Sequence, residues 1–157
     1  MTIYPDNSLV IFDFDGTLIY SMPFWDNLAL SELVRHGIEP DVALLNRLPE
    51  MTMHEVAAYQ ADHYPVLGTA DDILAAWQNR ARDAFQNELA YKPGALELVT
   101  DLNRRGKKIA IATMSQRAIV ELALRRHPVG ALIDTLVTLE DVGVGKHEPA
   151  IWFEVTQ

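Results

Sequence analysis

Cysteine is absent from the 157-residue sequence, and long apolar runs are absent as well. Without cysteine the chain can form no disulfide bond, zinc–thiolate site or cysteine nucleophile, and this fits a cytoplasmic protein. No apolar run approaches the roughly 18 residues that cross a bilayer. The first residues also lack the basic and apolar regions of a secretory signal. We therefore expect a cytoplasmic protein with no membrane partner.

Basic residues are scarce too. The chain has 13 Lys and Arg against 22 Asp and Glu, which gives a formal net charge of -9. Most of the imbalance lies in residues 1–91, which hold 14 acids and 4 bases. Nucleic-acid binding depends on clustered Lys and Arg, so we expect no nucleic-acid partner. With 49% hydrophobic residues, the chain can still bury an ordinary globular core.

Three short apolar segments predict β-strands. They are rich in β-forming residues and span residues 8–13, 108–113 and 135–138. Segments that are apolar on both faces are typical of a parallel sheet covered by helices. The sequence therefore predicts an α/β fold with a Rossmann-like parallel sheet of three strands.

The residues between the first two strands show helical periodicity and no convincing strand. A capping box at Thr52 and Glu55 marks the start of one helix. The stretch is too long for a plain crossover and too periodic for a loop. We therefore expect an inserted all-α module, with helices near residues 23–36, 41–48, 53–63 and 70–88.

Two more helices are expected around the second strand. Residues 93–105 carry Pro93 at the predicted first helical position, and Gly106 ends the segment. Residues 116–126 follow Ser115, which is a favourable N-cap residue. The core thus reads as a β-α-β-α-β unit.

Asp13 and Asp15 stand two residues apart where the first predicted strand ends. The turn that follows can aim both carboxylates into the crevice at the carboxyl end of a parallel sheet, where open α/β folds bind ligands. Two close carboxylates there require a cation, or a proton on one of them. Taken alone, the pair favours a turn and a helix-cap role for Asp15 over a functional one.

Polar groups also follow the other two strands. Thr113 ends the second strand, and its hydroxyl and the backbone N–H groups at Met114 and Ser115 form a natural anion site. Lys146 lies in a glycine-containing loop after the third strand. Taken singly, Thr113 could be an ordinary strand residue and Lys146 an exposed lysine. The carboxyl ends of parallel strands share one edge, so these groups predict a single site.

In this order the motifs resemble those of the haloacid dehalogenase superfamily, specifically its helical-cap phosphatases and β-phosphoglucomutase-like members. The matching residues are 13–18, 109–113, and Gly145 and Lys146 with Pro149. The resemblance covers nearly the whole chain. It implies a hydrolase core made of residues 1–17 and 92–157, with a helical cap over residues 18–91.

The resemblance also implies a role for each site residue. Asp13 would be the nucleophile that accepts the phosphoryl group, and Asp15 would be the general acid and base. Thr113, Met114 and Lys146 would hold the phosphoryl oxygens. Asp13 would bind Mg²⁺ through its carboxylate and Asp15 through its backbone carbonyl, together with acids of a fourth motif, and the ion would let two carboxylates and a phosphate dianion coexist.

The resulting expectation is a Mg²⁺-dependent phosphatase of a small phosphorylated metabolite, with a sugar phosphate favoured. Dehalogenase members of the family lack the second aspartate, so Asp15 favours phosphate esters. A phosphosugar mutase is a further alternative, although residues 49–52 lack the arginine expected of the mutases. A catalytically inactive domain that binds phosphate or a partner chain is the alternative of a different class.

One family motif is missing. The acidic fourth motif would lie beyond Gln157, so we expect a piece of a longer protein that is poorly active alone and binds Mg²⁺ weakly. The strand that would pair beside residues 8–13 is missing with it. An apolar edge strand promotes pairing with another chain, so we also expect self-association through this edge.

Overall fold

The structure, a computed structural model, describes residues 9–143 and 149–155. It confirms the predicted fold class, an α/β fold with three parallel strands and a helical insertion. The chain divides into two compact units. The core unit comprises Met1–Ser21 and Phe85–Gln157, and the helical unit comprises Met22–Ala84.

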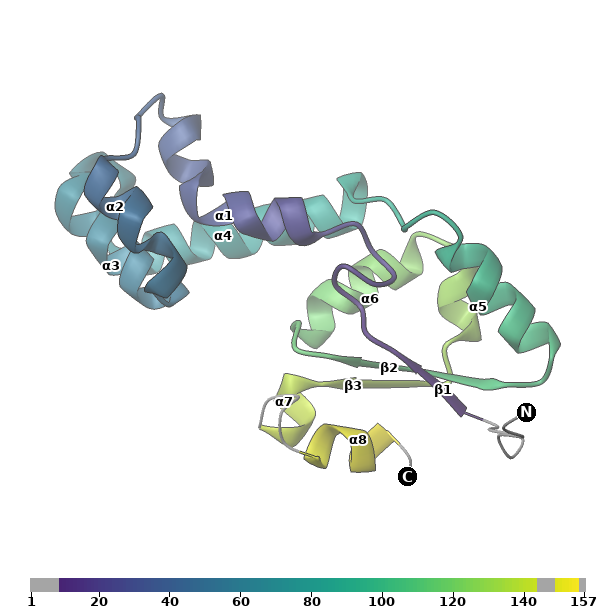
Figure 1. Cartoon of the computed structure of the whole chain (residues 1–157). Coiled ribbons are helices and arrows are strands. Elements are labelled where there is room, and N and C mark those ends of the chain that lie inside the picture. Colours follow the sequence, from purple (N-terminus) through teal and green to yellow (C-terminus); the bar gives the residue numbers. More distant parts are fainter. Residues whose placement is uncertain (1–8, 144–148, 156–157) are drawn as a thin grey trace. The chain divides into compact units, whose positions relative to one another are not determined.

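The sheet of the core unit has the strand order β1-β2-β3, and both pairs are parallel (Figure 1). Its strands are β1 (Leu9–Phe12), β2 (Lys108–Thr113) and β3 (Thr135–Thr138). In register, Phe12 lies opposite Ile111 and Thr113 lies opposite Thr138. The carboxyl ends of all three strands therefore meet at one edge, as the sequence predicted.

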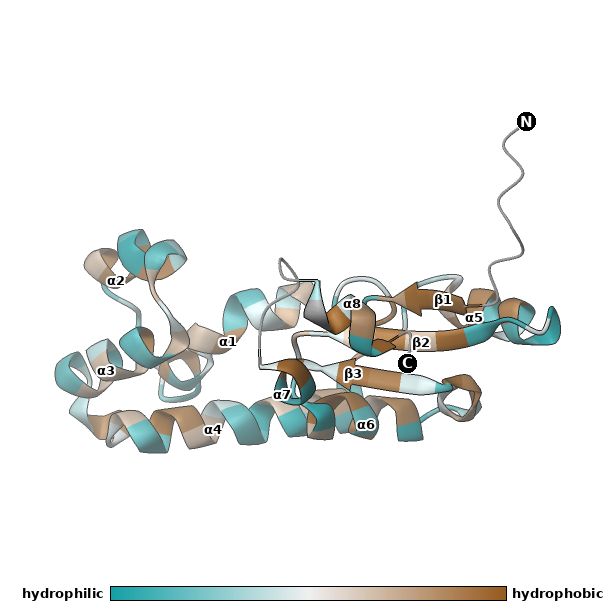
Figure 2. Ribbon diagram, turned by 90° about the horizontal axis from the view of Figure 1, so that it is seen from below, coloured by the Kyte–Doolittle hydropathy of each residue, from teal (hydrophilic) through white to brown (hydrophobic). Residues whose placement is uncertain are grey.

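Helices cover both faces of the sheet. Figure 1 shows α5 (Ala95–Arg104) and α6 (Arg117–Arg125) on one face, and α7 (Leu139–Val142) and α8 (Ala150–Val155) on the other. Figure 2 shows the strands as largely hydrophobic ribbons. The sheet and α8 share a buried cluster made of Ala110, Ala112, Val137, Ile151 and Val155. Burial on both faces explains why β2 reads as a continuous apolar run.

Two of the expected helix starts are wrong. The helix predicted from Pro93 begins at Ala95, because Gly94 adopts a left-handed φ of 80° and serves as the N-cap. The next helix, α6, has Gln116 as its N-cap, and no side chain caps it. Ser115 does not fill that role because its hydroxyl donates to Asp15.

The helical unit has its own core. Its helices are α1 (Met22–Arg35), α2 (Val42–Arg47), α3 (Met53–His63) and α4 (Ala70–Asp83), with short 3₁₀ segments at Leu48–Glu50 and Pro65–Leu67. The capping box of Thr52 and Glu55 is confirmed, and Thr69 and Asp72 form a second one. The predicted helix over 70–88 changes to a π-helix, η3, at Ala84–Glu88. The fully buried side chains of this unit include Leu33, Leu44, Val56, Ile73 and Trp77.

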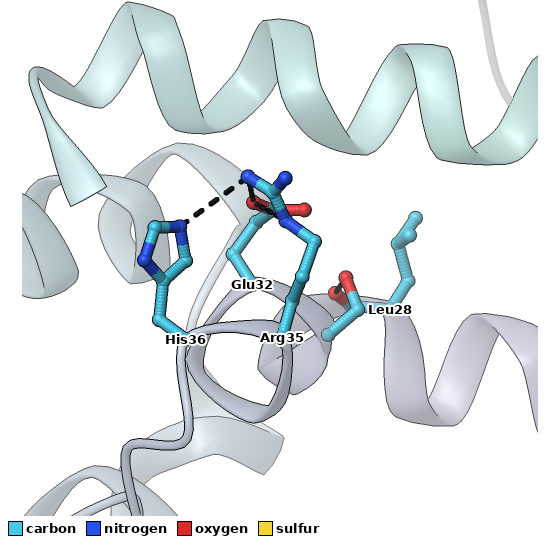
Figure 3. A network of polar contacts seen from close by, with 5 residues as sticks. Leu28, Glu32, Arg35 and His36 are labelled. Carbon is cyan, nitrogen blue, oxygen red and sulfur yellow. Dashed lines mark hydrogen bonds and ion pairs between the residues drawn. The ribbon is translucent and has the colours of Figure 1, made fainter.

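A buried carboxylate lies on α1. Glu32 is only 7% exposed. It accepts two hydrogen bonds from Arg35, one from Nε at 2.9 Å and one from Nη2 at 2.6 Å. Figure 3 shows the Arg35 guanidinium directed at both the Glu32 carboxylate and the ring of His36. Both donors contact the same oxygen, Oε2, and these two charge-assisted hydrogen bonds offset part of the cost of burying the Glu32 charge.

The compact helical unit lies within residues 18–91, the range expected for the cap, and those cap boundaries stay a prediction. Leu18–Tyr20 and Ala90–Lys92 belong to the core unit, where they pair with each other as an antiparallel ribbon around the Ile19–Tyr91 bridge. The Tyr20 N–H donates to the Ala90 carbonyl, and the Lys92 N–H donates to that of Leu18. Within residues 9–143 and 149–155, no helix is both long and apolar enough to cross a membrane.

Candidate active site

Asp13 directly follows β1 at the carboxyl edge of the sheet. Its side chain is exposed, and Oδ1 accepts a hydrogen bond from the Phe14 N–H at 2.7 Å. Phe14 is fully buried and stacks on Phe85, with ring centroids 6.1 Å apart. The ring of Phe14 is anchored in the core, and it therefore fixes the backbone of the aspartates on either side. Their carboxylates are more exposed than this ring.

A tight turn follows Asp15. The carbonyl of Phe14 accepts the N–H groups of Leu18 at 2.9 Å and Ile19 at 3.2 Å, and the Gly16 N–H donates to the Ile19 carbonyl at 3.0 Å. Gly16 has a φ of 70°, a left-handed conformation that a residue with a side chain adopts only with strain. This requirement accounts for the glycine in the Asp13–Gly16 motif.

Asp15 is half-buried, and a hydroxyl donates to each of its carboxylate oxygens. Ser21 Oγ donates to Oδ1 at 2.7 Å, and Ser115 Oγ donates to Oδ2. Ser21 is fully buried, and its Oγ also accepts the Gly16 N–H at 3.3 Å. The structure thus brings Asp15 into direct contact with the segment that follows β2.

Thr113 is the last residue of β2 and is 1% exposed. Its Oγ1 accepts the N–H of Ser115 at 3.1 Å. The Ser115 N–H, one of the backbone donors expected to bind an anion, therefore donates to the Thr113 side chain instead. Met114 lies between these residues with its side chain 43% exposed. The phosphate-binding roles of Thr113 and Met114 remain predictions, and Lys146 lies outside the described residues.

The carboxylate of Asp141, three residues after the end of β3, serves the local fold. Asp141 Oδ2 accepts hydrogen bonds from the Thr138 hydroxyl at 2.7 Å and from its N–H at 2.6 Å. Arg117 Nη2 donates to the same oxygen at 2.7 Å. The Thr138 hydroxyl, followed by its N–H and Arg117, holds the pKa of Asp141 below its usual value. Asp141 is therefore engaged in capping α7.

Asp13 and Asp15 are the residues that could hold a metal ion. Carboxylate oxygens suit Mg²⁺, which commonly takes one or two carboxylates from a protein and keeps several waters. In the part of the chain that the structure describes, no three His, Asp or Glu side chains gather into a metal site. The Asp13 carboxylate and the Asp15 backbone carbonyl together offer Mg²⁺ two oxygen ligands.

Sequence reasoning missed two residues that shape this site. Ser21 holds Asp15, and Lys92 Nζ donates to the Gly16 carbonyl at 2.8 Å. The segment of residues 91–94 resembles the family's return from the cap to the core, but no local pattern reveals the side-chain contacts of Ser21 and Lys92, because their partners meet only after folding. Lys92 does stand next to the Pro93–Gly94 turn, but that signal gives no partner for its side chain.

Comparison with known proteins gives a consistent result. A family model described as haloacid dehalogenase-like hydrolase matches residues 10–157. Hexitol phosphatase A of Escherichia coli K12 is 31% identical over 148 residues, which cover 88% of this chain and 62% of that protein. The chain therefore spans less than two thirds of the length of this curated relative.

Solved structures share the fold. A Thermotoga maritima protein that carries a provisional beta-phosphoglucomutase assignment superposes with a TM-score of 0.79 at 22% identity, over 94% of this chain and 68% of that one. YfnB of Bacillus subtilis, solved with bound magnesium, gives a TM-score of 0.66 at 18% identity, over 95% and 72% of the two chains. At these identities the likeness shows the fold alone.

Proposed function

Because the chain belongs to the haloacid dehalogenase-like hydrolases, we propose that it forms part of a phosphatase that acts on a small phosphorylated metabolite, with a sugar phosphate as the favoured substrate. The observation that carries this proposal is Asp15, a carboxyl held by two hydroxyls two residues after the exposed carboxylate of Asp13. The similarity to a hexitol phosphatase supports the substrate class.

Asp13 is the proposed nucleophile. A carboxylate oxygen of Asp13 attacks phosphorus, and the bond between phosphorus and the ester oxygen breaks. The leaving oxygen takes the proton from Asp15, so the products of this step are a free alcohol and an aspartyl-phosphate at Asp13. The exposed position of Asp13 at the end of β1 is compatible with attack on a bound phosphate ester.

Asp15 then acts as the general base. It accepts a proton from a water molecule whose oxygen attacks the phosphorus, and the bond between phosphorus and the Asp13 carboxylate breaks. Inorganic phosphate leaves, Asp13 regains its charge and Asp15 is protonated for the next cycle. Both roles require a carboxyl with a fixed orientation, and the hydroxyls of Ser21 and Ser115 provide one.

The remaining groups bind the phosphoryl oxygens. We assign this role to the Thr113 hydroxyl, the Met114 N–H and Lys146. The Asp13 carboxylate and the Asp15 backbone carbonyl would hold Mg²⁺, which when bound neutralises negative charge on the phosphoryl group and the carboxylates. The oxygen donors of these two residues support this assignment.

A non-catalytic phosphate-binding domain is the second candidate function. The observation in its favour is that Asp13 and Asp15 have no third acidic or histidine ligand grouped with them among the described residues. A mutase is a weaker alternative, because the mutase-like structural neighbour supports only the fold.

The test is release of inorganic phosphate from a panel of hexitol and sugar phosphates, with Mg²⁺ and with EDTA. We expect Mg²⁺-dependent release that Asp13→Asn abolishes, since an amide of nearly the same shape is a poor nucleophile. Turnover that survives in Asp13→Asn would overturn the assignment. Binding of phosphate or vanadate without turnover would favour the non-catalytic candidate.

A further inference from the structure

Ser115 occupies a position where a purely structural role is expected. It directly precedes Gln116, the N-cap of α6, and serine is a favourable helix cap. The α6 N-cap makes no side-chain hydrogen bond. The Ser115 hydroxyl instead donates to Asp15 Oδ2, across 100 residues of sequence. The Ser115 side chain therefore contributes to the candidate active site and not to the capping of α6.

Ser115 also contacts the proposed phosphate site. Its backbone N–H donates to Thr113 Oγ1 at 3.1 Å, while its hydroxyl contacts Asp15. One residue thus fixes the relative position of the general acid and of a phosphate-binding hydroxyl. Phosphoryl transfer depends strongly on such alignment, because little else lowers its barrier.

The two oxygens of Asp15 differ in their surroundings. Oδ1 accepts a hydrogen bond from Ser21, which is fully buried. The Gly16 N–H donates to the Ser21 hydroxyl and fixes it further. Oδ2 is held by Ser115, which is only half-buried. The oxygen that exchanges a proton with the substrate must be reachable, so Oδ2 is the better placed of the two.

We propose that Ser115 is a positioning residue that holds Asp15 Oδ2 as the proton-exchanging oxygen of the reaction. This proposal rests on the phosphatase function proposed above. A protonated carboxyl keeps acceptor capacity, so the Ser115 hydroxyl can hold Oδ2 both before and after the proton leaves. The Ser115 proton itself stays on its own oxygen throughout.

Leaving-group dependence provides the kinetic test. Protonation matters for the alcohol of a sugar phosphate and little for the phenolate of an aryl phosphate. We expect Ser115→Ala to lower kcat about tenfold for the sugar phosphate, the effect of losing one hydrogen bond to a charged group, with KM unchanged. Pre-steady-state release of nitrophenol from p-nitrophenyl phosphate, which reports the first step alone, should slow by less than about twofold. Ser115→Thr, which keeps the hydroxyl, should restore both rates.

A matched control removes a hydroxyl from the same unit but outside the site. Thr100 donates to the Leu96 carbonyl within α5, so Thr100→Val should leave both rates unchanged. A loss in the first-step rate for p-nitrophenyl phosphate as large as the loss in kcat for the sugar phosphate in Ser115→Ala would overturn the proposal. So would an unchanged kcat accompanied by faster amide exchange at the start of α6, the signature of a helix cap.

A second measurement needs no turnover. The side-chain carboxyl ¹³C resonance of Asp15, assigned by its loss in Asp15→Asn, should shift in Ser115→Ala but not in Thr100→Val. An unshifted resonance would overturn the proposal even if the chain were inactive. Absence of phosphatase activity in the unmodified chain, with the resonance shifted as expected, would instead contradict the proposed function and leave the contact between Ser115 and Asp15 established.

Discussion

Lys92 Nζ donates to the backbone carbonyl of Gly16 at 2.8 Å, although 76 residues separate them in the sequence. The contact fastens the segment that returns from the helical unit to the turn that follows Asp15. The Lys92 N–H strengthens the same junction by donating to the Leu18 carbonyl at 2.8 Å. The geometry of the Asp15 turn therefore depends on a residue far outside the motif.

Replacing Lys92 should loosen this turn. We expect Lys92→Met to lower the free energy of unfolding by about 1 kcal/mol, since a charged donor to a partly buried carbonyl is lost. Urea denaturation measures the change. Lys92→Arg keeps a donor and should recover part of the loss. If Lys92→Met unfolds at the same urea concentration as the unmodified protein, the contact contributes nothing.

Removing the acid at Asp15 should affect substrates unequally. In Asp15→Asn we expect kcat for a sugar phosphate to fall by roughly 10²–10⁴, the usual contribution of general acid and base catalysis. An aryl phosphate should lose less in the first step, because its leaving group needs no proton. Pre-steady-state release of nitrophenol measures that step. An equal loss for both substrates would count against the acid role.

The ion pair between the exposed Arg35 and the buried Glu32 on α1 predicts a stability effect in the helical unit. Arg35→Met leaves Glu32 buried without its partner, and we expect unfolding to become easier by about 1–3 kcal/mol. The double variant Glu32→Met with Arg35→Met removes the stranded charge and should recover much of this loss. Denaturation followed by the circular dichroism of the helices tests both variants. No recovery in the double variant would show that packing by Arg35 dominates.

Acid should weaken the start of α2. The hydroxyl of Tyr64, the N–H of Leu44 and the hydroxyl of Tyr59 hold the pKa of Asp41 below its usual value. Because the pKa of Asp41 is depressed in the folded protein, its contribution to stability is present above the pKa of about 3.9 of the unfolded chain. That contribution is lost as the pH falls through the pKa of the folded state.

One variant tests the direction of this pH dependence. Asp41→Asn should be less stable than the unmodified protein near neutral pH, and the difference should shrink as the pH falls below about 4. Thermal melts between neutral pH and about pH 3 measure it. A difference that stays constant over this range would contradict a role for the Asp41 charge.

Local patterns predicted the secondary structure well. The strands at 108–113 and 135–138 and the helix at 53–63 match the structure at both ends. Apolar runs and caps such as Thr52 are properties of neighbouring residues, so a sequence reveals them. The start at Pro93 failed because a general preference for proline in the first turn gave way to the left-handed Gly94.

The candidate site was predicted less completely. The motif residues Asp13, Asp15 and Thr113 could be chosen because strand ends converge in any parallel sheet. The contacts of Ser21, Ser115 and Lys92 could not, since they depend on side chains that meet only after folding. Self-association through β1 and the role of Lys146 stay predictions.

The open side of β1 has a consequence for how rigid Asp13, the proposed nucleophile, can be. Within the described residues β1 pairs only with β2, and its four residues are all half-buried. A strand hydrogen-bonded along one side can fray by local opening at a smaller free-energy cost than a strand clamped on both. Asp13 would inherit that motion, because it directly continues β1. Whatever chain segment lies along the free side would then act on catalysis by stiffening the nucleophile, without touching the substrate.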